Sequence, residues 1–285
     1  MKVYILFAIL YALFTGAHKV FKKKSDQKSN EIAILTIFTF ICFMLSLIWI
    51  PFNVSIDSKY IWLFVLKGFI IALSWFCTLK VMKTADVSLV ALTTVLSAVI
   101  TFLIGVFAFH ESATWLQIVG AVVIVGGAVL INLMNKTDSK KANVTQILLL
   151  LLIAINSSAS TVIDKVTTSV LEFHQVQFWF LLFVFLFSFL FFSIECLRNK
   201  KFLIEKNDFK NFWIYLVAFT LFIGDIFLFL SYKCADSQMI IISIVSQLKT
   251  VVAVLLGIVL FKEKNYMKKI LISLLIFGGI LMVSL

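Results

Sequence analysis

The sequence has very little proline and no clustered cysteine. Its single proline, Pro51, ends an apolar stretch, so proline interrupts no apolar segment in its interior. Four cysteines are scattered along the chain without CxxC spacing: Cys42, Cys77, Cys196 and Cys234. We therefore expect neither a disulfide framework nor a zinc site, and we interpret these residues as small apolar side chains.

Common enzyme and nucleotide-binding motifs are absent as well. The chain contains no HExxH, no P-loop, no Rossmann glycine pattern and no Cys/His cluster. His110 and His174 stand alone near predicted loops. An integral-membrane enzyme would need acid, base or metal-binding residues gathered at one interface. We therefore expect no metal, no cofactor and no enzymatic activity.

Acidic residues are scarce: 14 Asp and Glu stand against 25 Lys and Arg, which gives a net charge of +11. Such a charge could indicate nucleic-acid binding, but the lysines lie in short segments between long apolar runs. The chain is 62% hydrophobic with a mean hydropathy of +1.10, far above the range of soluble domains. The pattern predicts a polytopic membrane protein whose partners include anionic lipid headgroups and exclude nucleic acid.

Apolar windows long enough for a hydrocarbon layer of roughly 30 Å predict an all-α fold with ten transmembrane helices. The predicted spans are 2–20, 31–52, 60–82, 87–109, 113–133, 145–167, 172–197, 209–232, 237–261 and 267–285. A polar stretch near residue 140 divides them into five and five. The predicted organisation is an N-terminal five-helix repeat (1–134), a polar linker loop (135–144) and a C-terminal five-helix repeat (145–285).

Loop charges predict the orientation. Most Lys and Arg residues fall in the odd-numbered connections, so these connections are expected in the cytoplasm and both termini outside, in the plasma membrane. The basic residues assigned to the opposite side are Lys2, Lys59, Lys67, Lys165 and Lys233. No small-residue cleavage site follows the first span, which we therefore expect to be retained.

Two stretches of the sequence resemble each other. Ala85–Glu111 and Cys234–Glu263 each begin with Ala-Asp shortly after a lysine and end in Phe-x-Glu, and each half later carries an apolar-Gly-Gly-apolar stretch. The first spans correspond more loosely, with Lys19 aligned to Lys165. Repeats of five spans have opposite orientations in the membrane, which is the inverted-repeat architecture of many secondary transporters.

The chain resembles the ten-helix, EamA-like branch of the drug/metabolite transporter superfamily. The resemblance rests on the Ala-Asp entry to spans four and nine, the Phe-x-Glu ends and the paired glycines. The resemblance implies export or exchange of small organic metabolites through a cavity lined by spans one, three, four, six, eight and nine. Two features depart from the family pattern. Ala98 and Thr250 stand where spans four and nine commonly carry proline, and the charge bias places the termini outside.

Charged residues inside the membrane are the strongest candidates for a binding site. Lys249 lies near the middle of span nine and Asp225 near the middle of span eight. Their similar depth suggests a pair, which is either a structural bridge or a site where a zwitterionic substrate replaces both partners. Proton coupling through Asp225 is a further alternative. Trp75, aligned with Asp225, could stack on a substrate or simply pack among neighbouring side chains.

Two polar stripes with helical spacing support a central cavity, although polar residues of this kind also bond neighbouring helices. The stripe in span six contains Asn156, Ser160 and Asp164, and that in span one contains Tyr11, Thr15 and His18. Span nine adds Ser246 and Gln247, and span four adds Thr94. Glu111 and Glu263, at helix ends, are expected to interact with the N-terminus of the next helix.

These observations predict a secondary transporter for a small polar or zwitterionic metabolite, such as an amino acid, working by alternating access between two halves. The candidate binding residues are Lys249, Asp225, Trp75, Asn156, Ser160, Ser246, Gln247, Tyr11, Thr15, His18 and Thr94. Exchange of phosphorylated or nucleotide-linked metabolites and export of drugs or cations are the alternatives. The oligomeric state stays open, and a monomer is compatible with one complete cavity per chain.

Overall fold

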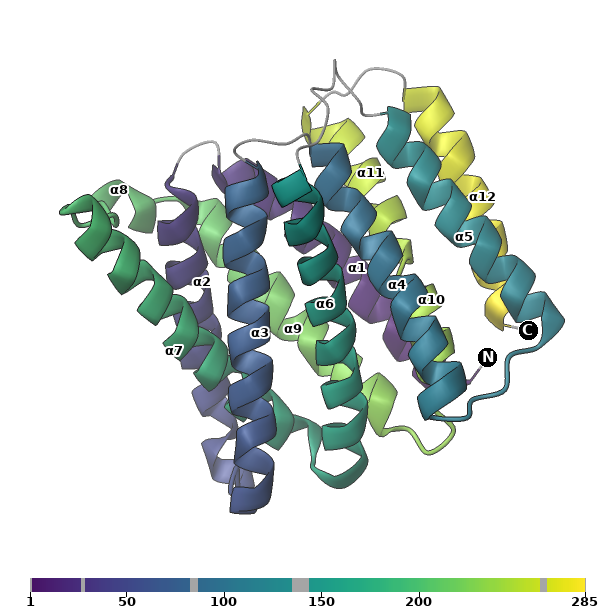
Figure 1. Cartoon of the computed structure of the whole chain (residues 1–285), viewed down its shortest axis with the longest axis horizontal. Coiled ribbons are helices and arrows are strands. Elements are labelled where there is room, and N and C mark those ends of the chain that lie inside the picture. Colours follow the sequence, from purple (N-terminus) through teal and green to yellow (C-terminus); the bar gives the residue numbers. More distant parts are fainter. Residues whose placement is uncertain (1, 27–28, 83–86, 135–143, 262–265, 285) are drawn as a thin grey trace.

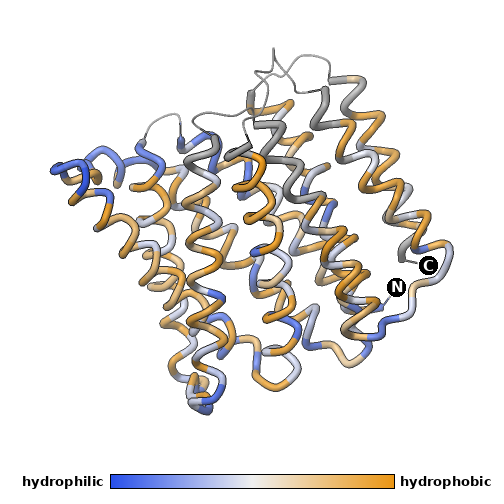
Figure 2. The backbone as a smooth tube through the Cα atoms, viewed as in Figure 1, coloured by the Kyte–Doolittle hydropathy of each residue, from blue (hydrophilic) through white to orange (hydrophobic). Residues whose placement is uncertain are grey.

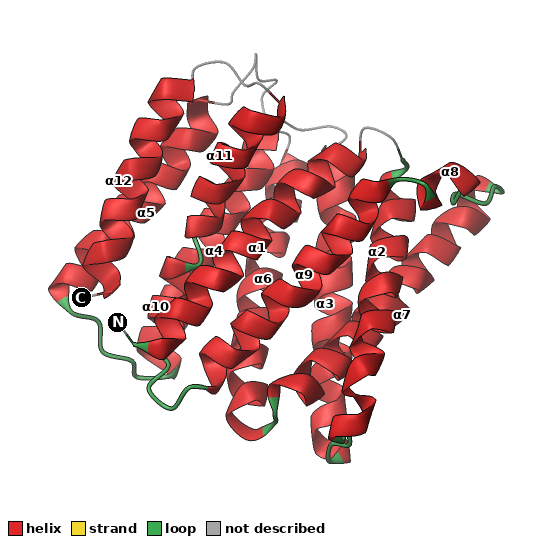
Figure 3. Ribbon diagram, turned by 180° about the vertical axis from the view of Figure 1, so that it is seen from behind, coloured by secondary structure: helices red, strands yellow, loops and turns green. Residues whose placement is uncertain are grey.

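The computed structural model describes residues 2–26, 29–82, 87–134, 144–261 and 266–284. Within those ranges the regular structure is helical and no strand occurs (Figure 3). The elements are α1 (Val3–Asp26), α2 (Glu31–Ser46), the 3₁₀ turn η1 (Leu47–Phe52), α3 (Ser58–Met82), α4 (Val87–Ala108), α5 (Trp115–Met134), α6 (Val144–Val170), α7 (Phe173–Asn199), α8 (Lys206–Phe209), α9 (Phe212–Lys233), α10 (Met239–Val245), α11 (Leu248–Phe261) and α12 (Tyr266–Ser284).

Seven segments of the described chain are long and apolar enough to cross a membrane. They comprise α1, α2 with η1, α3, α6, α7, α9 and α10 with α11. Shorter apolar helices, Leu96–Ala108, Trp115–Gly127 and Ile270–Gly279, lie within the other three predicted spans. Apolar residues dominate the middle of the bundle and polar residues gather toward its ends (Figure 2). The chain is therefore an integral membrane protein built from helices.

The first helix before residue 140, α1, and the first helix after it, α6, run in opposite directions. In Figure 1, α1 starts beside the label N, whereas α6 starts at the opposite end of the bundle. The labels N and C lie at the same end. This arrangement follows from an odd number of crossings in each set of helices, as the sequence repeat predicts.

Each main contact between helices has a counterpart between the equivalent helices of the other half. The contact of α1 with α9 corresponds to that of α6 with α3, and the contact of α4 with α6 corresponds to that of α11 with α1. The helices α2 and α7 pack on each other, as do α5 and α12. The sequence repeat is thus reproduced in the pairing of helices.

Small residues allow α1 to approach α11 closely. Ala8, Ala12 and Gly16 recur every four residues on α1 and are buried, the spacing that brings membrane helices together. A Cβ atom added to Gly16 would lie 2.6 Å from Cβ of Val252 and 2.8 Å from the carbonyl oxygen of Lys249. Gly16 therefore fixes the distance between α1 and the segment that carries Lys249.

We predict that Gly16→Ala lowers the stability of the protein by about 1–3 kcal/mol, because the added methyl group overfills a packed helix interface. Gly126→Ala is the matched control, since a Cβ atom at Gly126 meets nothing within 4 Å. Thermal unfolding in detergent compares the two proteins. Equal melting temperatures for both variants would contradict the close approach of α1 and α11.

Candidate functional site

The ninth predicted span is interrupted shortly before Lys249. The sequence predicted one helix over 237–261, but α10 ends at Val245 and α11 begins at Leu248. The N–H groups of Gln247 and Lys249 donate to the carbonyl oxygens three residues earlier, at 2.9 and 3.1 Å. Proline is not required for this break. Polar side chains stabilise it, because the Ser246 hydroxyl donates to the Ser243 carbonyl oxygen at 2.7 Å.

A cavity of about 80 Å³ lies at this interruption. Its lining comes from both sets of helices: Tyr11 of α1, Ser97, Ala98 and Thr101 of α4, Ser157 and Thr161 of α6, Leu228 and Tyr232 of α9, and Ile242, Ser243, Ser246, Gln247 and Lys249 of the α10–α11 segment. Most of these side chains carry a hydroxyl, amide or amine. Such a cavity has room for several water molecules or a small polar solute.

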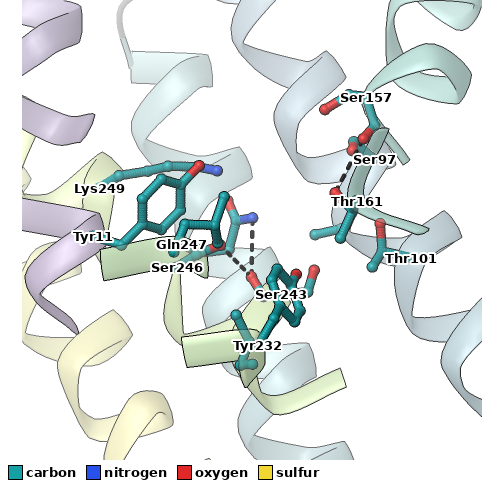
Figure 4. Close-up of a pocket in the computed structure, with 13 residues that line it drawn as sticks. Tyr11, Ser97, Thr101, Ser157, Thr161, Tyr232, Ser243, Ser246, Gln247 and Lys249 are labelled. Carbon is teal, nitrogen blue, oxygen red and sulfur yellow. Dashed lines mark hydrogen bonds between the residues drawn. The ribbon is translucent and has the colours of Figure 1, made fainter. Parts of the chain in front are cut away.

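The ammonium group of Lys249 points into this cavity (Figure 4). Lys249 and Tyr11 lie on one side, while Ser97 and Ser157 lie on the other. Among the described residues, no carboxylate lies within ion-pair distance of Lys249. The charge close enough to act on it is another cation, Lys19 of α1. The cavity thus holds an amine for which the described residues supply no acidic partner.

Gln247 adds an unused acceptor to the same cavity. Its amide nitrogen donates to the Ser243 carbonyl oxygen at 3.5 Å, but its Oε1 atom is buried and has no hydrogen-bond partner. A buried acceptor without a donor costs free energy, typically about 1–3 kcal/mol. The cavity therefore offers one cation and one free acceptor, contributed by residues two positions apart.

Of the eleven residues predicted from the sequence, Lys249, Ser246, Gln247 and Tyr11 line the cavity. Asp225, Trp75, Asn156, Ser160, Thr15 and His18 do not belong to its lining. The side chain of Thr94 lies outside the described part of the structure.

The suggested pair between Asp225 and Lys249 is not formed. Asp225 is buried on α9 without an ion-pair partner among the described residues, and one of its oxygens, Oδ2, accepts no hydrogen bond. The buried ion pair of the membrane interior joins Lys67 of α3 to Asp164 of α6. Lys67, counted among the basic residues of the outer side although it falls in the predicted span 60–82, is only 2% exposed. Sequence analysis did not interpret this lysine, which lies within an apolar run, as a buried charge.

Apart from Tyr11, the side chains of the two predicted polar stripes do not line the cavity. Asn156 and Ser160 are buried on α6. The nitrogen Nδ1 of His18 lies 3.0 Å from the backbone oxygen of Val217 on α9. The His18 contact fits the alternative in which polar side chains join neighbouring helices, whereas the Nδ2 atom of Asn156 has no hydrogen-bond partner.

Two further predicted residues contact neighbouring helices. The Thr15 hydroxyl packs near Gly224, where an added Cβ atom would lie 3.5 Å from it. The Trp75 ring packs on Phe38, with 5.5 Å between ring centroids, and Lys22 Nζ lies 6.0 Å from it. Both residues thus take part in helix packing around the cavity.

Sequence reasoning missed part of the cavity lining: Ser97, Thr101, Ser157, Thr161, Tyr232 and Ser243. Two signals could have found some of them. Ser97 and Thr101, like Ser157 and Thr161, are four residues apart and share a helix face. Ser97 and Lys249 also directly precede Ala98 and Thr250, the two positions aligned by the repeat. Both then line the same cavity from opposite halves of the sequence.

Glu111 contacts a different helix from the predicted one. Its carboxylate oxygens accept hydrogen bonds from the N–H groups of Met239 at 2.7 Å and Ile240 at 2.9 Å. It therefore caps α10 and not the following helix α5, since α10 begins beside the end of α4. The equivalent residue Glu263 lies outside the described residues. Within the described chain, no group of three His, Cys, Asp or Glu side chains could hold a metal ion.

Comparisons with known proteins agree with this architecture. The model of the EamA-like transporter family matches residues 2–133 and, a second time, residues 144–285. No curated protein matches the sequence. A solved crystal structure superposes with a TM-score of 0.78 at 14% sequence identity, covering 100% of this chain and 97% of that chain. At this identity the likeness shows a shared fold alone.

Proposed function

Because the chain belongs to the EamA-like transporter family, we propose that it is a secondary transporter for a small zwitterionic metabolite, such as an amino acid. The family membership itself indicates a membrane transporter of the drug/metabolite type. The substrate class is our inference from the cavity between α1, α4, α6, α9 and the interrupted α10–α11 segment.

The observation that carries the proposal is the amine of Lys249 in a polar cavity, without an acidic partner among the described residues. A cation buried in the membrane without a counter-charge is costly, by about 2.5–3.5 kcal/mol on insertion scales. A substrate carboxylate would supply the missing negative charge together with charge-assisted hydrogen bonds. A ligand that carries a carboxylate would therefore bind more tightly than one that lacks an anionic group.

The second end of the substrate would be positively charged. Gln247 Oε1 lacks a donor, and the hydroxyl groups of Tyr11 and Tyr232 border the same space. A substrate ammonium can donate to all three acceptors. This replaces the role first suggested for Asp225, which does not line the cavity. A carboxylate and an ammonium a few bonds apart describe an amino acid.

The size of the cavity argues against the alternative substrates. Pockets for drug-sized ligands occupy about 300–1,000 Å³, whereas this cavity measures about 80 Å³. A nucleotide-linked metabolite is too large for it, and a cationic drug would be repelled by Lys249. A phosphorylated substrate would favour two facing cations, but Lys19 does not line the cavity.

Alternating access fits the position of the cavity between two oppositely directed sets of helices. We propose ten transmembrane helices in two five-helix halves, working as a monomer with lipid around its apolar rim. By the loop charges, we place the protein in the plasma membrane with both termini outside. No enzymatic step and no cofactor are needed for this mechanism.

Thermal-shift measurements on the purified protein test the substrate class. The ligands are the neutral, acidic and basic amino acids, matched monocarboxylates and amines, inorganic phosphate and a nucleotide sugar. A ligand at 100 times its dissociation constant stabilises the folded protein by about 2.7 kcal/mol. We expect stabilisation by one or more amino acids and none by the amine or carboxylate alone. Stabilisation by the nucleotide sugar or phosphate only would refute the proposal.

A further inference from the structure

A second group of charged residues lies buried outside the cavity. Lys67 of α3 forms an ion pair with Asp164 of α6. The Lys67 ammonium also lies 3.6 Å from the centroid of the Phe180 ring and 4.8 Å from that of Phe229. Aromatic faces favour a nearby cation. This pair is therefore enclosed on several sides by protein and is neutral as a unit.

Asp225 of α9 adds a further acidic group to this pair. Phe229, which faces Lys67, follows Asp225 by one helical turn. Both Lys67 and Asp164 act electrostatically on Asp225. Asp225 is 6% exposed, and its Oδ2 atom has no hydrogen-bond partner. The three residues hold two carboxyl groups and one ammonium, so one carboxyl lacks a balancing charge.

The helices around Asp225 provide no second cation for it. The titratable groups that face α9 in this region are Tyr11 and His18 of α1, Cys42 of α2, Lys67 of α3 and Asp164 of α6. From α7 and α10, which also pack against α9, no titratable group among the described residues acts on Asp225. The His18 ring nitrogen Nδ1 is already engaged by the backbone oxygen of Val217, and Tyr11, Cys42 and Asp164 are neutral or anionic.

We propose that Lys67, Asp164 and Asp225 form a proton-binding site in which Asp225 carries the proton, and that this proton moves in step with the substrate. The second part rests on the proposed transport function. In the closed state Asp225 is a neutral carboxylic acid, since an unpaired buried carboxylate is costly. When the cavity opens and water reaches it, the O–H bond breaks heterolytically, water takes the proton, and the carboxylate stays on Asp225.

A proton fits this site better than a metal ion. Sodium or calcium requires several oxygen ligands around one position, whereas the Lys67 ammonium is paired with Asp164, acts electrostatically on Asp225 and repels a second cation. A proton needs one oxygen only. The orphaned Oδ2 atom of Asp225 is such an oxygen.

Two helices connect this site to the cavity. On α9, Leu228 and Tyr232 line the cavity and lie three and seven residues after Asp225, on the same helix face. On α6, Ser157 and Thr161 line it and lie seven and three residues before Asp164. A movement of α6 or α9 that reshapes the cavity therefore also changes the distance between Lys67 and the carboxyl groups.

Infrared difference spectroscopy of the purified protein without ligand tests the proton site directly. We expect a carbonyl stretching band of a protonated carboxyl group in neutral buffer, lost on titration to alkaline pH. The band should be absent in Asp225→Asn and retained in Lys249→Gln and in Asp57→Asn, whose carboxylate lies exposed beside Lys59. Asp225→Glu, which keeps the acid, should show the band at a shifted frequency.

Three results would overturn the proton site: no such band in the wild-type protein, an unchanged band in folded Asp225→Asn, or an unshifted band in Asp225→Glu. Loss of the wild-type band on adding sodium chloride at constant pH would assign a metal cation to the site and overturn it too. If Asp225→Asn does not fold, the wild-type titration and Asp225→Glu still decide.

Proteoliposomes containing a pH-sensitive dye test the coupling. A mixture of neutral amino acids added outside should change the internal pH with wild-type protein and not with Asp225→Asn, which should still be stabilised by the same mixture in thermal shift. An equal pH change with both proteins would refute the coupling. If the mixture does not bind the wild-type protein, the transport proposal fails, and the infrared measurement still decides whether Asp225 binds a proton.

Discussion

Replacing Lys249 by glutamine is expected to weaken substrate binding while making the protein more stable. The variant loses the charge-assisted hydrogen bonds to a substrate carboxylate, worth about 1.5–3 kcal/mol. This corresponds to a dissociation constant raised about tenfold to a hundredfold. At the same time the variant loses an uncompensated cation in the membrane interior. Thermal unfolding with and without the amino acid found in the ligand screen measures both effects.

The opposite signs of these two effects separate a binding role from a structural one. A residue that only stabilises the fold would lower the melting temperature when replaced. Lys19→Gln is the matched control, because Lys19 acts on Lys249 electrostatically but does not line the cavity. It should leave the affinity within a few-fold of the wild-type value. Wild-type affinity in Lys249→Gln would refute the proposed site.

Replacing Lys67 by methionine is expected to destabilise the protein by about 3–5 kcal/mol. Removing one partner of a buried ion pair leaves the other charge in an apolar interior, here Asp164 on α6. The second change Asp164→Leu should recover most of this loss, since well-packed apolar residues often replace a buried pair without cost. Unfolding curves of the two single variants and the double variant, all in the same detergent, give the coupling energy.

Additive effects of the two changes would show that Lys67 and Asp164 contribute independently, contrary to the structure. A matched pair is available at the surface, where Lys59 lies 3.2 Å from Asp57 and both side chains are well exposed. Exposed pairs contribute about 0–1 kcal/mol. Lys59→Met should therefore change stability far less than Lys67→Met, although both remove a lysine from the same helix, α3.

The sequence repeat relates two contacts between the halves by position, but it does not reveal which side-chain chemistry each contact uses. Its alignment of Lys19 with Lys165 sets His18 against Asp164, and its alignment of Trp75 with Asp225 sets Lys67 against Val217. In the structure, each contact joins one residue of the first aligned pair to one residue of the second. Asp164 bonds to the Lys67 ammonium, and His18 bonds to the backbone oxygen of Val217. The contact between Asp164 and Lys67 is ionic, whereas that between His18 and the Val217 backbone is a neutral hydrogen bond.

Individual site residues were harder to predict, because adjacent residues on a helix point about 100° apart. Asn156 and Ser157 are both polar and both in the middle of α6, yet only Ser157 lines the cavity. The sequence places both at the correct depth. Only the packing of α6 against α3 and α4 decides which of them faces the cavity.

The sequence by itself determined that this chain is a helical membrane protein of two related halves, since a hydrocarbon layer requires long apolar helices whatever their neighbours are. It also singled out Lys249 as a charge deep in a span. Only the tertiary structure decided that α10 and α11 are separate helices, that Lys67 pairs with Asp164, and that Asp225 and Lys249 stay apart. These features depend on how each helix is rotated and tilted against the others, and apolar composition alone carries no information about that.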